Sequence, residues 1–429
     1  MRWVVAGTIG IILAAVAACG QGQTPDPGPR PLWTAQVETG AQDVAVVGNV
    51  AVVIGERTVL GLDKDTGRQV WRRSLGEQTG AVVAGDRVVI QGDPAEALTH
   101  RVFVLDAATG TPVWGTPPSL WRSVVYADAV YSGDCPAGGV VCTLVALGMR
   151  DGRELWRLPK VTGNVGADTI GRRGPFAPQA GPRLLLTGAP QGGLTLLDPA
   201  TGVASAASVP RERGWFALAA GDLIVTTDHD PPGGDRNCTV AVTSYSGDTG
   251  KKTTSGAVYS GRERGGECQR TFGDRHAGAV LIGAGTRIAA ATADDAVQVY
   301  DLATGRTVWR SDERGVPLES DGTTLLVRDT ADEGGFRLLD FQTGAVRWKA
   351  PDSGLSGLSA SWDCALTAGL VAVQGAVGEK PFVRVYAARS GEDRGRFGSW
   401  LAGLGDDWVA TTRGSGPNRL ALEMFRVTP

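Results

Sequence analysis

The chain has 429 residues, of which 42% are hydrophobic and 20% are charged, and its formal net charge is −3. This composition predicts a globular protein with a hydrophobic core and argues against a disordered chain. The balance of 42 basic and 45 acidic residues excludes the basic footprint of a nucleic-acid-binding protein and a polybasic membrane patch.

The N-terminus predicts an export signal that ends in a lipidation site. Residues 1–18 form the predicted signal peptide, whose apolar stretch, 4–18, is short for a membrane span and typical of a secretory signal. It ends in Val-Ala-Ala-Cys, which resembles the lipobox of bacterial lipoproteins, so we expect cleavage before Cys19 and lipid on its sulfur. The alternative is an ordinary export signal with an incidental cysteine. Residues 19–31 then form a lipidated N-terminus and a Pro- and Gly-rich tether.

The remainder, residues 32–429, is expected to form a single domain made of one repeated unit. Its marker is the pattern Asp-x-x-Thr-Gly-x-x-x-Trp, in which Asp accepts hydrogen bonds from the turn and Gly takes the left-handed conformation. The repeat turns are Asp63 and Gly67, Asp106 and Gly110, Asp198 and Gly202, Asp301 and Gly305, and Asp340 and Gly344. With weaker copies, marker glycines stand at 67, 110, 152, 202, 250, 305, 344 and 391.

Each repeat contains short alternating apolar runs separated by turns, such as residues 50–54 and 58–62, and no stretch shows sustained helical periodicity. Four-stranded units of this length that repeat around a ring predict an all-β fold, a β-propeller. Residues 31–37 look like an isolated outer strand, and residues 407–427 look like a unit that lacks one. We therefore expect the N- and C-terminal strands to pair and close the ring. The literal count is nine units.

The repeat motif resembles the pyrroloquinoline-quinone-like (PQQ-like) propeller repeat over nearly all of residues 31–429. The resemblance implies eight blades, which we favour over nine. The family includes quinoprotein dehydrogenases, sensor domains of bacterial Ser/Thr kinases and the lipoprotein of the outer-membrane barrel-assembly machine. The motif tryptophans could form a ligand-stacking array, but a large aromatic residue at one register favours packing against the neighbouring blade. These structural staples are Trp33, Trp71, Trp114, Trp156, Trp309 and Trp348.

Catalysis is not expected. The resemblance implies that a quinone-dependent member would need an adjacent Cys pair, a Ca²⁺ site, a basic residue and a carboxylate base, and the sequence has no adjacent Cys pair. The loop 228–237 offers oxygen ligands that could bind Ca²⁺, but it lacks the spacing of a calcium loop and has the composition of a surface turn. We predict no catalytic residue, no cofactor and no metal site.

Five cysteines follow Cys19. In an exported chain they can form disulfides. Cys135 and Cys142 flank a Gly-rich loop and are expected to pair, as are Cys238 and Cys268, while Cys364 is expected to be a buried thiol.

The sequence therefore predicts a monomeric lipoprotein that is exported and lipid-anchored to the outer face of the cell membrane. Its expected role is non-enzymatic: a scaffold that binds an envelope protein or a ligand through loops at 171–182, 228–237 or 260–276. The alternatives are a quinone-dependent dehydrogenase and a sensor or carbohydrate-binding propeller. Barrel assembly ranks low because Arg supplies 36 of the 42 basic residues, which is typical of a G+C-rich genome and hints at a single-membrane bacterium.

Overall fold

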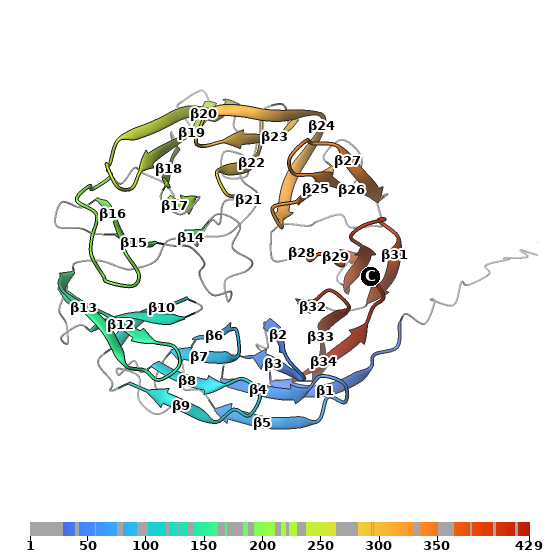
Figure 1. Cartoon of the computed structure of the whole chain (residues 1–429). Helices are drawn as coiled ribbons and strands as arrows, with labels where there is room; N and C mark the ends of the chain where they lie inside the picture. Colours follow the sequence, from blue (N-terminus) through green and yellow to red (C-terminus); the bar gives the residue numbers. More distant parts are fainter. Residues whose placement is uncertain are drawn as a thin grey trace, which may run out of the picture.

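The computed structural model describes most of the chain from residue 29 onward. The described residues are 29–38, 43–55, 57–74, 80–91, 102–116, 120–126, 128–134, 141–161, 168–169, 183–187, 193–210, 216–219, 223–229, 237–262, 282–292, 294, 296–329, 335–350, 364–377, 380–397, 400–416 and 419–429. Every regular element within these ranges is a β-strand, and the strands are arranged in a ring (Figure 1). The predicted all-β propeller fold is confirmed. Within these ranges there is no apolar helix of the length needed to cross a bilayer.

Five sheets have four strands each. They are β2–β5 (Asp43–Val47, Val50–Ile54, Thr58–Asp63, Gln69–Ser74), β6–β9 (Gly80–Ala84, Arg87–Gln91, Val102–Asp106, Pro112–Gly115), β10–β13 (Leu120–Val125, Ala129–Asp134, Cys142–Gly148, Glu154–Val161), β28–β31 (Cys364–Leu366, Leu370–Val377, Lys380–Ala387, Asp393–Phe397) and β32–β34 (Trp400–Leu404, Trp408–Gly416, Arg419–Arg426) together with β1 (Trp33–Glu38).

The other three sheets depart from the four-stranded plan. They are β15–β16 (Leu184–Thr187, Leu194–Leu197), β14 with β17–β20 (Asp168–Thr169, Phe216–Ala219, Leu223–His229, Asn237–Ser246, Lys252–Arg262), and β21–β27 (Gly283–Ala284, Arg287–Ala291, Ala296–Asp301, Arg306–Ser320, Thr324–Asp329, Phe336–Asp340, Val346–Ala350). In the last sheet β24 pairs with β23 through its first part and with β25 through its second part. It therefore serves two units. The unit around β15 and β16 is described only in part, so the preference for eight blades over nine stays a prediction.

One sheet unites segments from both ends of the sequence. β1 pairs antiparallel with β34, from Trp33 opposite Met424 to Glu38 opposite Arg419. The alternation of the sequence fits this position, because Trp33 and Val37 are buried while Thr34 between them is exposed. The pairing satisfies the edge of β34 that would otherwise lie open.

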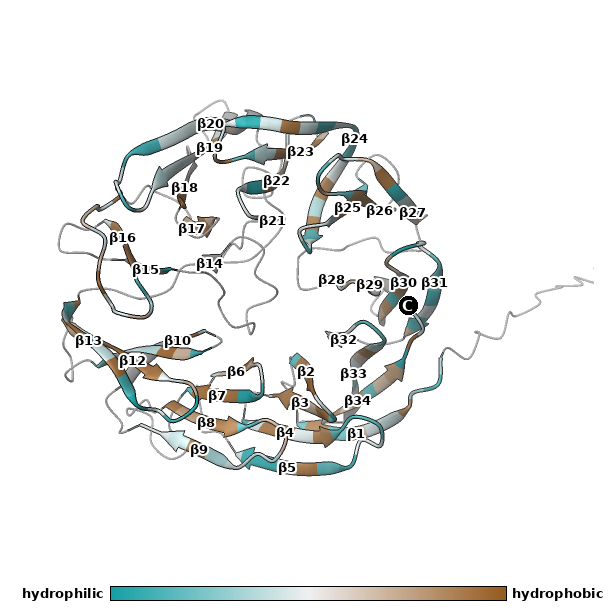
Figure 2. Ribbon diagram, in the orientation of Figure 1, coloured by the Kyte–Doolittle hydropathy of each residue, from teal (hydrophilic) through white to brown (hydrophobic). Residues whose placement is uncertain are grey.

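The hydrophobic core lies between neighbouring sheets. The middle strand β3 is buried along its whole length, whereas only Trp71 is buried in the outer strand β5. Figure 2 shows the same contrast between brown middle strands and outer strands of mixed colour. One buried cluster joins Val52 and Val59 of the first unit to Val88 and Ile90 of the second. Each sheet thus depends on the next for burial of its apolar side chains.

The disc has two different faces. In the first unit Lys64 N–H donates to Asn49 O (2.9 Å), which places the β2–β3 turn beside the β4–β5 turn. Equivalent bonds join Ala107 to Asp86, Met149 to Asp128, Leu302 to Thr286, Phe341 to Thr323, Ala388 to Gly369 and Val427 to Asp407. We call the surface formed by these short turns the turn face. The strand ends on the opposite side are joined by connections of very different lengths, from two residues between β29 and β30 to 13 between β27 and β28, and we call that side the connection face.

Candidate functional site

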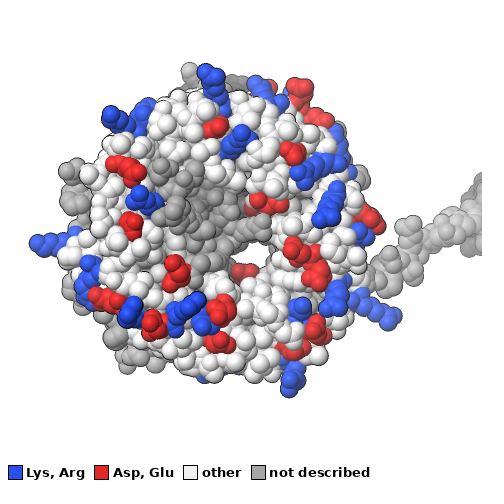
Figure 3. Space-filling model, in the orientation of Figure 1, with Lys and Arg blue, Asp and Glu red and all other residues white. Residues whose placement is uncertain are grey.

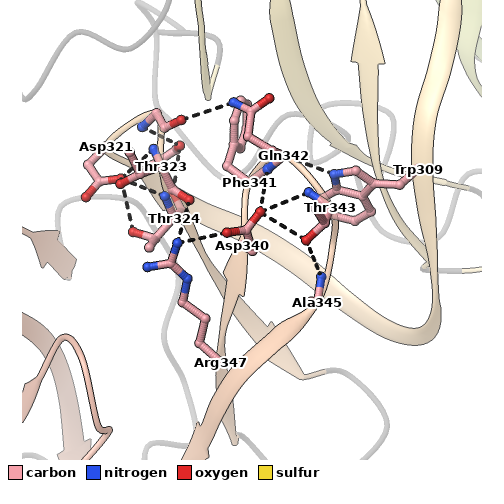
Figure 4. Close-up of polar contacts among 12 residues, drawn as sticks. Trp309, Asp321, Thr323, Thr324, Asp340, Phe341, Gln342, Thr343, Ala345 and Arg347 are labelled. Carbon is pink, nitrogen blue, oxygen red and sulfur yellow. Dashed lines mark hydrogen bonds and ion pairs between the residues drawn. The ribbon is translucent and has the colours of Figure 1, made fainter.

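The repeat turns are held by their aspartates. Asp340 Oδ1 accepts the N–H of Gln342 (3.0 Å), and the N–H (3.0 Å) and hydroxyl (3.0 Å) of Thr343 (Figure 4). Its second oxygen accepts Arg347 Nη2 (2.8 Å). The pKa of Asp340 is therefore lowered, first by Arg347 and then by Thr343. Turn bonds of the same kind are made by Asp63, Asp106, Asp198 and Asp301. A carboxylate with its oxygens so occupied is poorly suited to act as a general base.

A second aspartate extends the same turn network toward the centre of the disc. Asp321 Oδ1 accepts the N–H groups of Thr323 (2.8 Å) and Thr324 (2.7 Å), together with both hydroxyls. The two turns then meet, because Phe341 N–H donates to Thr323 O (3.0 Å) (Figure 4). This part of the turn face is consequently a fixed framework of local bonds.

The motif tryptophans lie between units. Each indole Nε1–H donates to a backbone carbonyl oxygen of the next unit, at the residue three before its marker glycine. The six bonds are Trp33 to Lys64 (2.7 Å), Trp71 to Ala107 (3.0 Å), Trp114 to Met149 (2.9 Å), Trp156 to Pro199 (2.8 Å), Trp309 to Phe341 (3.0 Å) and Trp348 to Ala388 (2.9 Å). The indoles therefore act inside the ring, as staples between units.

The marker glycine of the next unit completes each tryptophan contact. Gly344 has φ of 74°, a left-handed conformation that side chains disfavour, and a Cβ placed on it would lie 2.7 Å from Cδ2 of Trp309. Gly67 likewise has φ of 69° and faces Trp33 at 2.6 Å. The motif thus needs glycine both for the turn and for the close approach of the indole.

Three units lack the tryptophan, and at two of them the structure shows which residue of the same unit takes its place. The third is the unit of Gly391, which has Gly395 at this register. Thr254 stands at the tryptophan register, and its hydroxyl donates to Leu302 O (2.8 Å), the carbonyl that an indole would otherwise use. Its methyl carbon lies 3.1 Å from a Cβ placed on Gly305. At the preceding junction Ala207 packs on Gly250. The weaker sequence copies are therefore real junctions with smaller contacts.

A tyrosine accompanies both the Ala207 and the Thr254 junctions. We compare the residue five positions before the marker glycine in the unit that a tryptophan contacts. This residue is leucine in the units contacted by Trp33, Trp71, Trp114, Trp156 and Trp309. It is Tyr245 at the Ala207 junction and Tyr300 at the Thr254 junction. The hydroxyl of Tyr300 lies 3.5 Å from a Cβ placed on Gly305, so this ring fills the vacated space from its own unit. Tyr386 occupies the same position in a unit that does receive a tryptophan. Its ring packs against Trp348, with 5.7 Å between the ring centroids.

A buried ion cluster was not predicted from the sequence. Arg337 in β26 has a side chain with no exposed surface, and it pairs with Glu313 (2.6 Å) and Asp329 and donates to Arg314 O (2.8 Å). Lys349 also reaches Glu313 (2.7 Å) and, with Arg337, lowers the pKa of that carboxyl. Burial raises the pKa of Asp329. The four residues belong to four adjacent strands and have no shared repeat position, so no sequence signal marks them.

The other residues singled out from the sequence fall at or beyond the edges of the description. Cys19, Cys135, Cys268 and most of the loops 171–182, 228–237 and 260–276 lie outside the described residues. Cys142 begins β12. Cys238 belongs to β19, and the structure describes only the backbone of β19 at this residue. The disulfide pairs therefore stay predictions. Cys364 is a buried thiol in β28.

Charges of both signs are mixed on the described surface. Figure 3 shows basic and acidic side chains interspersed on the visible face, without a broad patch of one sign. Within the described ranges, His, Cys, Asp and Glu side chains form no group of three that could hold a metal ion.

Comparison with known proteins identifies the repeat. A family model described as outer membrane protein assembly factor BamB matches residues 26–230 and 262–424, which confirms the resemblance seen in the motif. Similar solved structures include BamB from Moraxella catarrhalis, at 13% identity and TM-score 0.41, covering 91% of this chain and 98% of that chain. They also include the computationally designed Ika8 protein (14%, TM-score 0.46, 86% and 99%) and dihydro-heme d1 dehydrogenase NirN (14%, TM-score 0.43, 85% and 78%). No curated protein matches the chain.

Proposed function

We propose, from the premise that the chain belongs to the family of outer membrane protein assembly factor BamB, that it is a lipid-anchored envelope protein that binds a partner protein and catalyses no reaction. The observation that carries the proposal is the use of the motif tryptophans. All six donate their indole N–H to the backbone of the next unit. These six indoles are thereby committed to contacts within the ring and are not available to stack on a quinone. Loops on a rigid scaffold commonly carry binding, so we assign binding to the connections between strands.

The lipid anchor rests on the sequence at Cys19. Small residues before this cysteine, at the end of a short apolar stretch, fit lipoprotein processing. We expect the wild-type chain to carry the mass of diacylglycerol and to sediment with membranes, and Cys19→Ser to remain an unlipidated precursor. An identical mass shift and processing in Cys19→Ser would contradict the anchor.

The absence of catalysis is tested by offering the cofactor. The purified full chain is incubated with pyrroloquinoline quinone and Ca²⁺, and the retained chromophore and the alcohol-dependent reduction of a dye are measured. We expect neither. A stoichiometric quinone complex that reduces the dye would overturn the non-enzymatic assignment and favour the dehydrogenase alternative.

The partner is proposed to be a protein because the family model favours this class over a sugar or a quinone. The test is photo-crosslinking in the native envelope from a residue on the connection face, such as the exposed Ser74 at the end of β5. A matched probe at the exposed Arg68, directly before the first residue of the same strand, reports the turn face. A discrete crosslinked protein from Ser74 alone is the expected result; adducts that are the same from both positions would contradict a specific binding face.

A further inference from the structure

The chain enters the ring at the turn face. β1 occupies the outer position of the closing sheet, and its Trp33 stands at the same register as Trp71, which follows a repeat turn. Leu32 N–H donates to Met424 O (2.7 Å), which extends the pairing by one residue before β1 begins. Outer strands run from the turn face to the connection face. The residues before Trp33 therefore leave the disc on the turn-face side.

The entry point is fixed by contacts with the neighbouring sheet. Gly395 in β31 stands four residues after Gly391, at the register where other units have tryptophan, and Pro29 occupies the space beside it: a Cβ on Gly395 would lie 2.7 Å from Pro29 Cγ. Arg394, which also belongs to β31, donates from Nη2 to the backbone oxygen of Pro429 (2.9 Å). Figure 1 marks the C-terminus beside this strand. Both ends of the described chain are thus held at one place on the rim of the turn face.

The length of chain beyond this fixed point limits its reach. Pro29 stands ten positions after Cys19, so even a fully extended tether spans no more than about 35 Å. The turn face is built from short turns, such as the five residues between β4 and β5. The connection face combines short connections, such as the two residues between β33 and β34, with long ones, such as the 20 residues between β20 and β21. A face of short turns can approach a planar surface more closely than one with long connections.

Several charged side chains on the turn face are paired with each other. Arg426 lies 3.3 Å from Asp65, Arg87 lies 2.9 Å from Asp86, and Arg347 lies 2.8 Å from Asp340. Within each pair the opposite charges offset one another, which weakens the attraction or repulsion that either charge alone would have for anionic lipid. The orientation of the disc would then depend on the tether and be insensitive to salt.

We propose that the turn face lies toward the lipid surface and that the connection face is presented to the partner. The inference rests on the proposed lipid anchor and adds to it the side of the disc that meets the bilayer.

The test compares the two ends of one outer strand. A fluorescent amino acid replaces Arg68 or Ser74 in the full lipidated chain, reconstituted on vesicles of phosphatidylethanolamine and phosphatidylglycerol that carry a headgroup-attached quencher. The two positions are six residues apart, or about 20 Å along a strand. We expect quenching to be at least about twofold stronger at Arg68, because this position would lie about 20 Å nearer to the quencher. The difference should not change in about 0.5 M salt. Equal melting temperatures of the two labelled proteins serve as the folding control.

The outcomes separate the orientation from the anchor. Equal quenching at both positions, or stronger quenching at Ser74, with the protein fully bound to vesicles, would overturn the orientation and leave the anchor intact. Failure of the wild-type chain to bind vesicles would overturn both. Lengthening the tether with ten Gly and Ser residues between Pro25 and Asp26 is expected to reduce the difference between the positions, and an undiminished difference would contradict the restraint by the tether.

Discussion

Folding alters the protonation of Asp43. It begins the inner strand β2, and burial raises the pKa of its carboxyl to about 6. Because the folded-state pKa lies above the ordinary value of 3.8, the folded protein binds an extra proton between these two pH values. Stability therefore falls as the pH rises through this window, and the cost is complete above pH 6.

Replacing this carboxyl should remove the pH dependence. We expect Asp43→Asn to raise the free energy of unfolding at pH 7.5 by up to about 3 kcal/mol, the equivalent of a shift of two pKa units, and to change it little at pH 4. Denaturant unfolding at several pH values measures the effect. The control is Asp312→Asn, which removes the same charge at an exposed position in β24. A parallel change in both variants at every pH would contradict a role for burial.

The cysteines give a second prediction at the scale of residues. Non-reducing peptide mapping should find Cys135 linked to Cys142 and Cys238 linked to Cys268, with Cys364 as a thiol. Each bridge is expected to contribute roughly 2–4 kcal/mol. The Cys238 bridge encloses more chain, so its loss should cost more. Alkylation of all five cysteines without a reductant would contradict both bridges.

At the scale of elements, the contact between tryptophan and glycine joins consecutive units. Trp309→Ala should lower the free energy of unfolding by roughly 3–5 kcal/mol, the usual cost of removing a packed aromatic side chain. Gly344→Ala should destabilise the same junction, because its Cβ would meet the indole at 2.7 Å. Thermal unfolding measures both. The matched control is Trp400→Ala, since this tryptophan is 53% exposed in the inner strand β32. An equal loss from the control and from Trp309→Ala would contradict the staple.

The junction without tryptophan can be repaired as a test of what fills it. Thr254→Trp alone should destabilise the protein, because the indole would compete with the Tyr300 ring for the space over Gly305. Tyr300→Leu restores the residue that five tryptophan junctions use, so the double variant should be more stable than the sum of the single changes predicts. A coupling of at least about 1 kcal/mol in denaturant unfolding is expected for residues in contact. Additive effects would show that the two side chains do not share the site.

At the scale of the whole molecule, the ring depends on a strand from the other end of the sequence. Deletion of residues 31–37 removes β1 from the closing sheet and Trp33 from Gly67. We expect faster hydrogen exchange in β33 and β34, because β34 becomes an edge. This effect would act across the 370 residues that separate the deletion from β33. Deletion of residues 20–28 is the control and should leave the exchange unchanged. Unaltered protection of β34 after loss of residues 31–37 would contradict closure by this strand.

Local chemistry in the sequence was sufficient to predict the all-β propeller. The turn Asp and Gly residues, the tryptophan register and the alternation of the strands recur in each strong copy, and these signals act over a few residues. The order of units along the ring follows from the same repetition.

Other features depend on residues that meet only when the ring forms. Thr254 replaces an indole because Leu302, 48 residues later, presents its carbonyl there, and Pro29 packs on Gly395 from the far end of the chain. The cluster around Arg337 joins four strands, and the pKa of Asp43 depends on burial by its neighbours. No local pattern encodes these contacts, because burial and pairing across units are properties of the closed ring. The sequence alone therefore determined the repeating unit, and the tertiary structure decided how unlike units are joined.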